Sequence, residues 1–470
     1  MSTILQRPVL EPARRRPIVL GGLLGLAGTV LSTLLSFEMV VALYLYSNVF
    51  QVVLPPLPVD TTVVLFALSV ALGGLVILRE GIYLRGLYLV MAFMPYLLWA
   101  ALSLAWTPSS KLVYDNLALL FTVDLWLLIV GAMILAHKRA RMMRFLTLLA
   151  VLSLVVAAMG VYVYLVYGSF KYAGWDVTRV YNEWGRAVAN GTIVLLILFL
   201  RSRFASARQL VLGALLALCT FFILISSSRS SLLVVAAPAF LFMVVYVAPF
   251  GRQGLALSRA QILMLLVAAM VVATVTTLLS AGYRIDTVNR LLKVLTQAEN
   301  TDLIMGANRF DYYAAALRYF FESPLIGHGV RSFSLLHRGV ESPGVHAHNI
   351  FLEILADSGV IGFAAFALLL LMAVRPLTLT RLRSDPMMLC VTMLFAGRFT
   401  AAMFGADLAY QNVLFLAIGL LALKPAPVIE EALEEDEAEE DRDQDAWETG
   451  VPGEHRWRPT PPGQDRPLTS

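Results

Sequence analysis

The sequence has few charged residues for its length. Only 14% of the 470 residues are Asp, Glu, Lys or Arg, whereas 59% are hydrophobic. Soluble domains carry about 25% charged residues, so this chain has too little charge to face water on all sides. The composition excludes an ordinary soluble protein and indicates an integral membrane protein.

Cysteine is also scarce. Cys219 and Cys390 both lie inside apolar runs, which excludes a disulfide framework and is typical of small buried side chains. A Gly-x-Ser-x-Gly nucleophile motif and a sequence repeat are missing as well. No cleavable signal peptide is expected, because the first apolar run is long and many others follow it. The apolar runs show no pair of Asp or Glu residues typical of a proton relay. The acidic residues that could be exceptions are Asp115, Asp124 and Asp407.

What the chain does have is a series of apolar runs of the length that crosses a bilayer. They lie at residues 17–54, 60–78, 86–105, 116–136, 145–167, 187–200, 209–227, 230–248, 260–280, 350–374, 386–403 and 411–423. The first run has room for one full span and a tilted or partial segment. We expect an all-α polytopic membrane protein with about twelve transmembrane helices and one large periplasmic loop that carries short amphipathic helices.

Basic residues alternate with these runs. When the spans alternate, one set of loops carries the clusters Arg79/Arg85, His137 to Arg144, Arg201/Arg203/Arg208, Arg252/Arg259 and Arg375/Arg381/Arg383. The positive-inside rule makes this set cytoplasmic, and Arg14 to Arg16 place the N-terminus on the same side. The other loops, at residues 106–116, 168–186, 226–231, 281–347 and 404–410, then face the periplasm.

This topology divides the chain into five parts. We expect a cytoplasmic N-terminus at residues 1–16, a helix bundle at 17–280, the large periplasmic loop at 281–347, the C-terminal spans at 348–424 and a tail at 425–470. The tail is acidic and Pro-rich with few hydrophobic residues, so it is expected to be a disordered cytoplasmic extension.

Arginines stand at two unusual places in the outward loops. Arg229 lies between two apolar runs with almost no loop around it, where a guanidinium is costly unless it meets a carboxylate, a lipid phosphate or a phosphorylated ligand. Arg309 follows Asn308 in the first turn of an expected amphipathic helix that ends before Pro324 and lies against the membrane surface. A cation at that end does not complement the helix dipole, which favours a ligand role.

The loop at residues 168–186 interleaves cations with aromatic rings. Lys171, Arg179 and Arg186 alternate there with Tyr172, Trp175, Tyr181 and Trp184. Such a set suits a phosphorylated sugar, because arginine binds phosphate oxygens and rings stack on sugar faces. It equally suits an aromatic belt at the membrane interface with no ligand.

Four of the six histidines lie close together in the sequence, at positions 328, 337, 346 and 348. A zinc site is not favoured, because the segment is rich in glycine, and His346 and His348 would diverge on a helix. His348 is distinctive because it stands directly before the expected helix start at Asn349.

Three motifs resemble the O-antigen ligase and O-antigen polymerase superfamily over residues 100–423. The first is His348-Asn349 followed by Gly359 and Gly362, and the second is Arg229 followed by Leu233. The third runs from Asn308-Arg309 to Pro324 and continues as Gly327-His328-Gly329.

The resemblance implies a membrane glycosyltransferase without a metal or other cofactor. It would move a glycan from an undecaprenyl-diphosphate carrier to a second lipid-linked glycan or to the lipid A-core, at the periplasmic face of the bacterial inner membrane. Arg229 and Arg309 would bind the diphosphate, and His348 would orient or deprotonate the acceptor hydroxyl. Arg186, Arg331, His346 and Asn349 are further candidates for substrate binding. Membrane lipids are expected as partners, and nucleic acid is not.

The residue types suit this chemistry in their own right. Diphosphate is already a fair leaving group, so the protein must chiefly neutralise charge and position the attacking hydroxyl, which fixed guanidiniums and a neutral imidazole can do. A transporter or flippase for the same lipid-linked glycan is the main alternative. It would have polar residues and broken helices at the middle of its spans, whereas here the polar residues gather at the outward ends. A peptidoglycan polymerase lacks motif support, and a receptor or scaffold would leave Arg229 and His348 dispensable.

Overall fold

The computed structural model describes residues 32–53, 58–167, 177–202, 206–226, 228–246, 259–280, 308–405 and 407–426. Within these residues every regular element is a helix, as expected. The chain divides into two units, residues 1–423 and 424–470. The expected N-terminal segment, the first part of the large loop and nearly all of the expected disordered tail lie outside the described residues, so these predictions stand untested.

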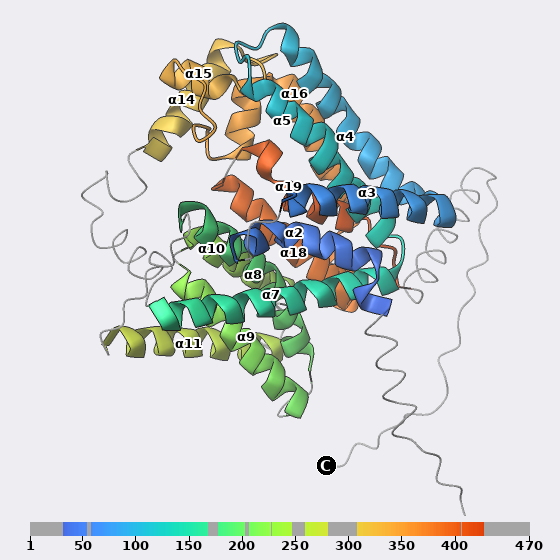
Figure 1. Ribbon diagram of the computed structural model, residues 1–470, viewed down its shortest axis with the longest axis vertical. Helices are drawn as coiled ribbons and strands as arrows, with labels where there is room; N and C mark the ends of the chain where they lie inside the picture. Colours follow the sequence, from blue (N-terminus) through green and yellow to red (C-terminus); the bar gives the residue numbers. More distant parts are fainter. Residues whose placement is uncertain are drawn as a thin grey trace, which may run out of the picture. The chain divides into compact units, whose positions relative to one another are not determined.

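Most helices of the first unit follow the expected apolar runs, whereas α14, α15 and α17 lie between them (Figure 1). They are α2 (Phe37–Val53), α3 (Thr61–Glu80), α4 (Leu84–Leu102), α5 (Leu112–Leu119), α6 (Leu125–Ile129), α7 (Arg139–Tyr167), α8 (Val177–Arg201), α9 (Ala207–Ile225), α10 (Arg229–Tyr246), α11 (Arg259–Ser280), α14 (Asn308–Glu322), α15 (Ser332–Arg338), α16 (Ile350–Val374), α17 (Leu379–Ser384), α18 (Pro386–Met403) and α19 (Asn412–Leu420). The π-helix η2 (Leu120–Asp124) joins α5 to α6, and the π-helix η3 (Val130–Leu135) continues α6, so that residues 112–135 form one candidate span. The 3₁₀-helix η1 (Ser103–Ala105) continues α4, and the 3₁₀-helix η5 (Leu408–Tyr410) lies between α18 and α19.

The chain is a multi-pass membrane protein, but the expected number of spans is not confirmed. Among the described residues, eight helices are long and apolar enough to cross a bilayer, and two shorter apolar helices cover Phe37–Val52 and Ser230–Val245. The run expected to form the last span contains only the nine-residue helix α19. A straight helical span needs about 20 residues, so an apolar run alone overestimates the length of this helix.

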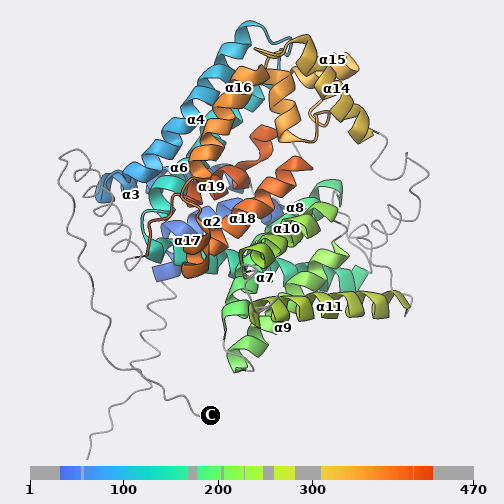
Figure 2. The ribbon, with the colours of Figure 1, turned by 180° about the vertical axis from the view of Figure 1, so that it is seen from behind.

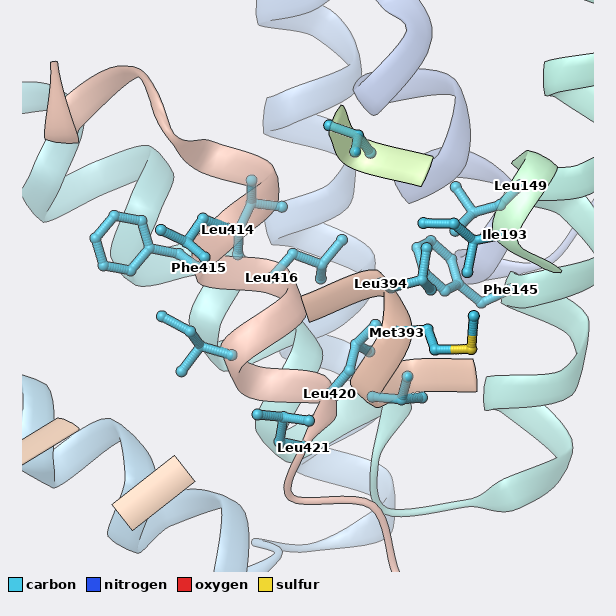
Figure 3. Packing of buried hydrophobic residues seen from close by; sticks show 14 of the residues in the cluster. Phe145, Leu149, Ile193, Met393, Leu394, Leu414, Phe415, Leu416, Leu420 and Leu421 are labelled. Atoms are coloured by element: carbon cyan, nitrogen blue, oxygen red, sulfur yellow. The ribbon is translucent and has the colours of Figure 1, made fainter. Parts of the chain in front are cut away.

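Helices from distant parts of the sequence share one apolar core. Phe145 and Leu149 on α7 belong to it together with Ile193 on α8, Met393 on α18 and Phe415 on α19. Figure 3 shows Phe145, Leu149, Ile193 and Met393 close to one another, with Phe415 farther away in the same cluster. The core fixes the helices that carry the polar loops and thereby sets the spacing of the residues in those loops.

Contacts between loops agree with the expected alternation of spans. At one end Arg139 pairs with Asp385, and Lys138 and Arg141 pair with Glu80. Arg381 donates a hydrogen bond of 2.6 Å to the carbonyl of Leu423 at the same end. The loops that carry the basic clusters therefore meet one another, as the positive-inside rule requires of loops on one side.

The other end of the bundle holds α14 and α15. Both views place these helices beside the connection between α4 and α5 (Figures 1 and 2). Thr107 in this connection donates a hydrogen bond of 2.9 Å to the carbonyl of Val330, and Glu341 accepts from the main chain of Lys111. The loops expected to face the periplasm thus also lie together, and their assignment to the periplasmic side remains a prediction.

Helix α16 is broken near its start. Gly359 has φ 62°, a left-handed conformation inside the helix. The amides of Val360 and Ile361 donate to the carbonyls of Pro324 and Leu325, at 2.8 and 3.2 Å. The carbonyls of the segment after α14 therefore accept from the amides that the break in α16 leaves without helical partners. This contact explains why the sequence motif has a glycine at position 359.

Gly359→Ala is expected to lower the free energy of unfolding by about 1–3 kcal/mol, because an L residue is strained at this φ. A Cβ atom there would also collide with the carbonyl of Leu325. Gly74→Ala is the matched control, since a Cβ on this α3 glycine meets nothing within 4 Å. The control should raise stability by up to about 1 kcal/mol. Unfolding of the purified protein in detergent measures both, and equal effects would contradict the prediction.

Candidate active site

Two histidines converge on a single carbonyl. The Nε2 atom of His346 and the Nδ1 atom of His348 lie 3.2 and 3.3 Å from the carbonyl oxygen of Gly405, and the ring centroids are 4.0 Å apart. A carbonyl can only accept, so each of these nitrogens must carry the proton. The Nε2 atom of His348 is then an unprotonated acceptor, which is the form a general base needs.

His348 has an unusual backbone. Its φ is 55°, in the left-handed region that residues other than glycine seldom adopt. The next residue, Asn349, caps α16 by accepting from the amides of Phe351 and Leu352 at 3.0 and 3.2 Å. The imidazole also stacks on Tyr312 with a centroid distance of 5.6 Å. Strain that the surroundings hold in place is typical of functional positions.

The environment keeps His348 neutral. Burial lowers the pKa of His348 to about 4, and the charges of His346 and Arg309 act in the same direction. Burial also lowers the pKa of His346, partly against the carboxylate of Asp407. An imidazole with this pKa is unprotonated at neutral pH and is available to accept a proton.

Arg186 joins this pair from α8. Its Nη2 atom lies 3.5 Å from the position that a Cβ on Gly405 would occupy, so its guanidinium lies beside the residue that both histidines contact. Its Nε atom donates a hydrogen bond of 3.2 Å to the hydroxyl of Ser230. Ser230 follows Arg229, which begins α10. The side chain of Arg229 lies outside the described residues, so its expected contact with diphosphate stays a prediction.

Arg309 approaches from α14. Its side chain is half-buried, and its positive charge lowers the pKa of both His346 and His348. Tyr312 and Tyr319 on one face of this helix pack against Phe333, and Phe310 is 64% exposed. The expected contact of the helix with the membrane surface stays a prediction.

Arg331 is fixed by buried acidic groups. Its guanidinium forms an ion pair with Asp407, and its main-chain amide donates to Asp357 at 2.8 Å. Asp407 also accepts from the side chain of Asn116 at 2.9 and 3.0 Å. These contacts explain why a non-glycine residue can hold φ 65° at this position. They give Arg331 a structural role, and its expected contact with substrate remains a prediction.

Buried carboxyl groups near this site were not expected from the sequence. Glu353 and Asp357 on α16 are both buried, and Asp357 accepts from the hydroxyl of Ser332 at 2.9 Å. Both carboxyl groups lie in one apolar run, but their burial does not test the expectation that these runs contain no proton-relay pair. Glu353 and Asp357 are four residues apart, which places both carboxyl groups on one face of the helix. This spacing was the feature of the sequence from which the buried pair could have been predicted.

The four clustered histidines do not gather around one point. His328 lies 2.9 Å from the carbonyl of Tyr319, and His337 stacks on Phe333 and contacts Tyr312, the ring that also stacks on His348, but not the carbonyl of Gly405. In the part of the chain that the structure describes, no three His, Cys, Asp or Glu side chains lie close enough to hold a metal ion.

Comparison with known proteins supports the family resemblance. A family described as O-antigen ligase matches residues 212–367, from α9 to the second half of α16. The matched segment contains Arg229, Arg309, Arg331, His346 and His348 but not Arg186. The expected resemblance to the O-antigen ligase and polymerase superfamily is therefore confirmed. No curated protein matches the chain.

Proposed function

We propose that this membrane protein, similar to O-antigen ligases over residues 212–367, transfers a glycan from an undecaprenyl-diphosphate carrier to an acceptor hydroxyl at the periplasmic face of the bacterial inner membrane. The observation that carries the proposal is the His348 imidazole, whose Nδ1 atom lies 3.3 Å from the carbonyl oxygen of Gly405, with the guanidinium of Arg186 near Gly405 and the charge of Arg309 acting on the ring. This arrangement joins a base with the cations that a diphosphate leaving group requires.

The proposed reaction is a single displacement. The acceptor hydroxyl oxygen attacks the anomeric carbon, and its proton passes to the Nε2 atom of His348. The bond from the anomeric carbon to the diphosphate oxygen breaks, and undecaprenyl diphosphate leaves with the electron pair. The imidazolium that forms on His348 is stabilised by the hydrogen bond from its Nδ1–H group to the carbonyl of Gly405.

Several arginines together bind the diphosphate in this proposal. The charge of Arg309 on α14 acts on the histidine pair, and Arg186 on α8 lies near Gly405. Arg229 begins α10 next to the serine that Arg186 contacts. Cations on three separate helices can surround a diphosphate, and they bind it most strongly as negative charge develops on the leaving oxygen. His346 and Asn349 position His348, the first through the shared carbonyl and the second through the cap of α16.

Reconstitution tests the proposal directly. The purified protein is mixed with an undecaprenyl-diphosphate glycan and either lipid A-core or a second lipid-linked glycan, with and without chelator. We expect transfer to one acceptor in both conditions, and strong loss of transfer in the Arg309→Ala and Arg229→Ala variants. Full activity of both variants would remove the diphosphate site, and loss of wild-type activity with chelator would remove metal independence.

The pH profile should report the lowered pKa of His348. A base works only when unprotonated, so activity is lost as pH falls through its pKa, and an ordinary histidine would lose it near pH 6.5. For the free enzyme we expect the acid limb of kcat/KM at about pH 4. Bound diphosphate offsets the charge of Arg309 and raises the pKa of His348. The acid limb of kcat should therefore lie at higher pH than the acid limb of kcat/KM. Coincident limbs near pH 6.5 would contradict this assignment.

A flippase for the same glycan is favoured by one observation. The break of α16 at Gly359 lies beside buried Glu353 and Asp357, as in transporters with interrupted helices. The break lies in the first half of the helix, on the side of the histidine pair, and its open hydrogen bonds are filled by the segment after α14. Movement of a fluorescent lipid-linked glycan across proteoliposomes, without transfer to any acceptor, would support this second function instead.

A further inference from the structure

Arg398 is a buried cation inside a membrane helix. It lies on α18, within an apolar run whose spacing gave no reason to single it out, and only 9% of its surface is exposed. Its Nε atom donates to the side-chain carbonyl of Asn190 at 2.8 Å, and its Nη2 atom donates to the main-chain carbonyl of Arg186 at 3.0 Å. Both partners are neutral.

Three other buried or half-buried arginines have a carboxylate beside them, whereas buried Arg381 bonds to main-chain carbonyls. Arg331 pairs with Asp407, Arg139 pairs with Asp385, and Arg144 pairs with Glu38. Among the described residues, no acidic side chain lies within ion-pairing distance of Arg398. Burial of a guanidinium without a counter-ion is costly, and such residues within membrane spans usually belong to functional sites.

The location of Arg398 links it to the histidine pair. The carbonyl it binds belongs to Arg186, whose own guanidinium lies beside Gly405. The charges of Arg398 and Arg186 are close enough to repel each other. Hydroxyl groups of Ser228 and Ser230, which lie 3.2 Å apart at the start of α10, complete the polar cluster on this side.

We propose that Arg398 and Arg186 together bind a phosphate-type anion, the diphosphate of the lipid-linked donor, which supplies the counter-charge that Arg398 does not find among the described residues. The inference rests on the proposed function and adds a residue to its donor site. Arg398 also holds the main chain of Arg186 and so orients the second guanidinium. An anion between two guanidiniums and a helix start is bound by charge-assisted hydrogen bonds.

The test uses Arg398→Gln, which removes the charge but keeps an amide donor for Asn190. Thermal unfolding of the full chain in nanodiscs is followed with inorganic pyrophosphate, undecaprenyl diphosphate or phosphatidylglycerol. We expect both diphosphates to stabilise the wild type, with a Kd that rises roughly 10- to 100-fold in the variant. Without ligand, the variant should be no less stable than the wild type, because a buried charge lacking a counter-ion has been removed.

Arg381→Gln is the matched control. Arg381 is also buried and donates hydrogen bonds to the main-chain carbonyls of Pro376 and Leu423, but it lies on α17 at the opposite end of the bundle. This variant should leave the response to diphosphate unchanged. A lower stability of Arg398→Gln with an unchanged Kd would show a purely structural residue and overturn the inference. Stabilisation by phosphatidylglycerol alone would overturn the assignment to a diphosphate.

Glycan transfer separates this inference from the proposed function. In Arg398→Gln the donor KM should rise roughly 10- to 100-fold while the acceptor KM stays constant, and Arg398→Lys should recover part of the loss. If the wild type transfers glycan and the donor KM of Arg398→Gln is unchanged, the inference about Arg398 is wrong while the proposed function stands. If the wild type binds diphosphate through Arg398 but transfers no glycan, the proposed function is wrong while the inference about Arg398 stands.

Discussion

His348→Ala is expected to slow glycan transfer by about 10²–10⁴-fold, the contribution typical of a positioned general base. The variant loses the Nε2 atom of His348, which is an unprotonated acceptor while the Nδ1–H group donates to Gly405. Asn349 still caps α16 and His346 still donates to the same carbonyl, so the fold around the site should persist. Single-turnover rates with saturating donor measure the chemical step directly.

Two further variants sharpen this test. His348→Gln keeps an N–H donor for the carbonyl of Gly405 but offers no base, so it should be as slow as the alanine variant. His328→Ala is the control, because His328 contacts the carbonyl of Tyr319 outside the histidine pair. It should remain within a few-fold of the wild type. A fast His348→Gln would mean that His348 orients the acceptor and does not take its proton.

Local sequence signals predicted much of the fold. Apolar runs predicted the helices, and basic clusters predicted which loops meet, as the pairs of Arg139 with Asp385 and Arg141 with Glu80 show. The cap at Asn349 and the start of α14 at Asn308 also follow from the sequence. These features depend on residues close together in the chain, where spacing and capping preferences act.

The remaining features depend on partners far away in the sequence. Arg331 was expected to meet substrate, yet its guanidinium contacts Asp407, which lies 76 residues later. Arg398 reaches Asn190 across 208 residues. The break at Gly359 depends on the carbonyls of Pro324 and Leu325. Periodicity describes one helix at a time and contains no information on which helices are neighbours.

The candidate site combines both kinds of information. The motifs singled out His348 and Arg309 because unusual residue types stand at helix starts. Only the fold shows that Gly405, in the loop after α18, brings Arg186 and the histidine pair together. Glycine carries no functional group, so its main-chain carbonyl could not have been recognised as part of a site from the sequence.

Asp407→Ala is expected to destabilise the protein by about 3–5 kcal/mol, because it leaves the buried Arg331 without its counter-ion. The amide of Asn116 and the main-chain N–H of Ala409 lose their acceptor as well. Unfolding by denaturant in mixed micelles measures the change. Glu322→Ala is the control, since its ion pair with Arg318 is exposed and should contribute at most about 1 kcal/mol.

A double-mutant cycle then separates the ion pair from the other contacts of Asp407. If the cost arises mainly from the unpaired guanidinium, Arg331→Met combined with Asp407→Ala should be more stable than Asp407→Ala alone. The remaining loss reports the contacts to Asn116 and Ala409. The pair anchors the loop between α14 and α16 to the loop after α18, which carry His348 and Gly405 respectively. Its removal should therefore lower glycan transfer as well, whereas a stable but inactive Asp407→Ala variant would place this carboxylate in the chemistry instead.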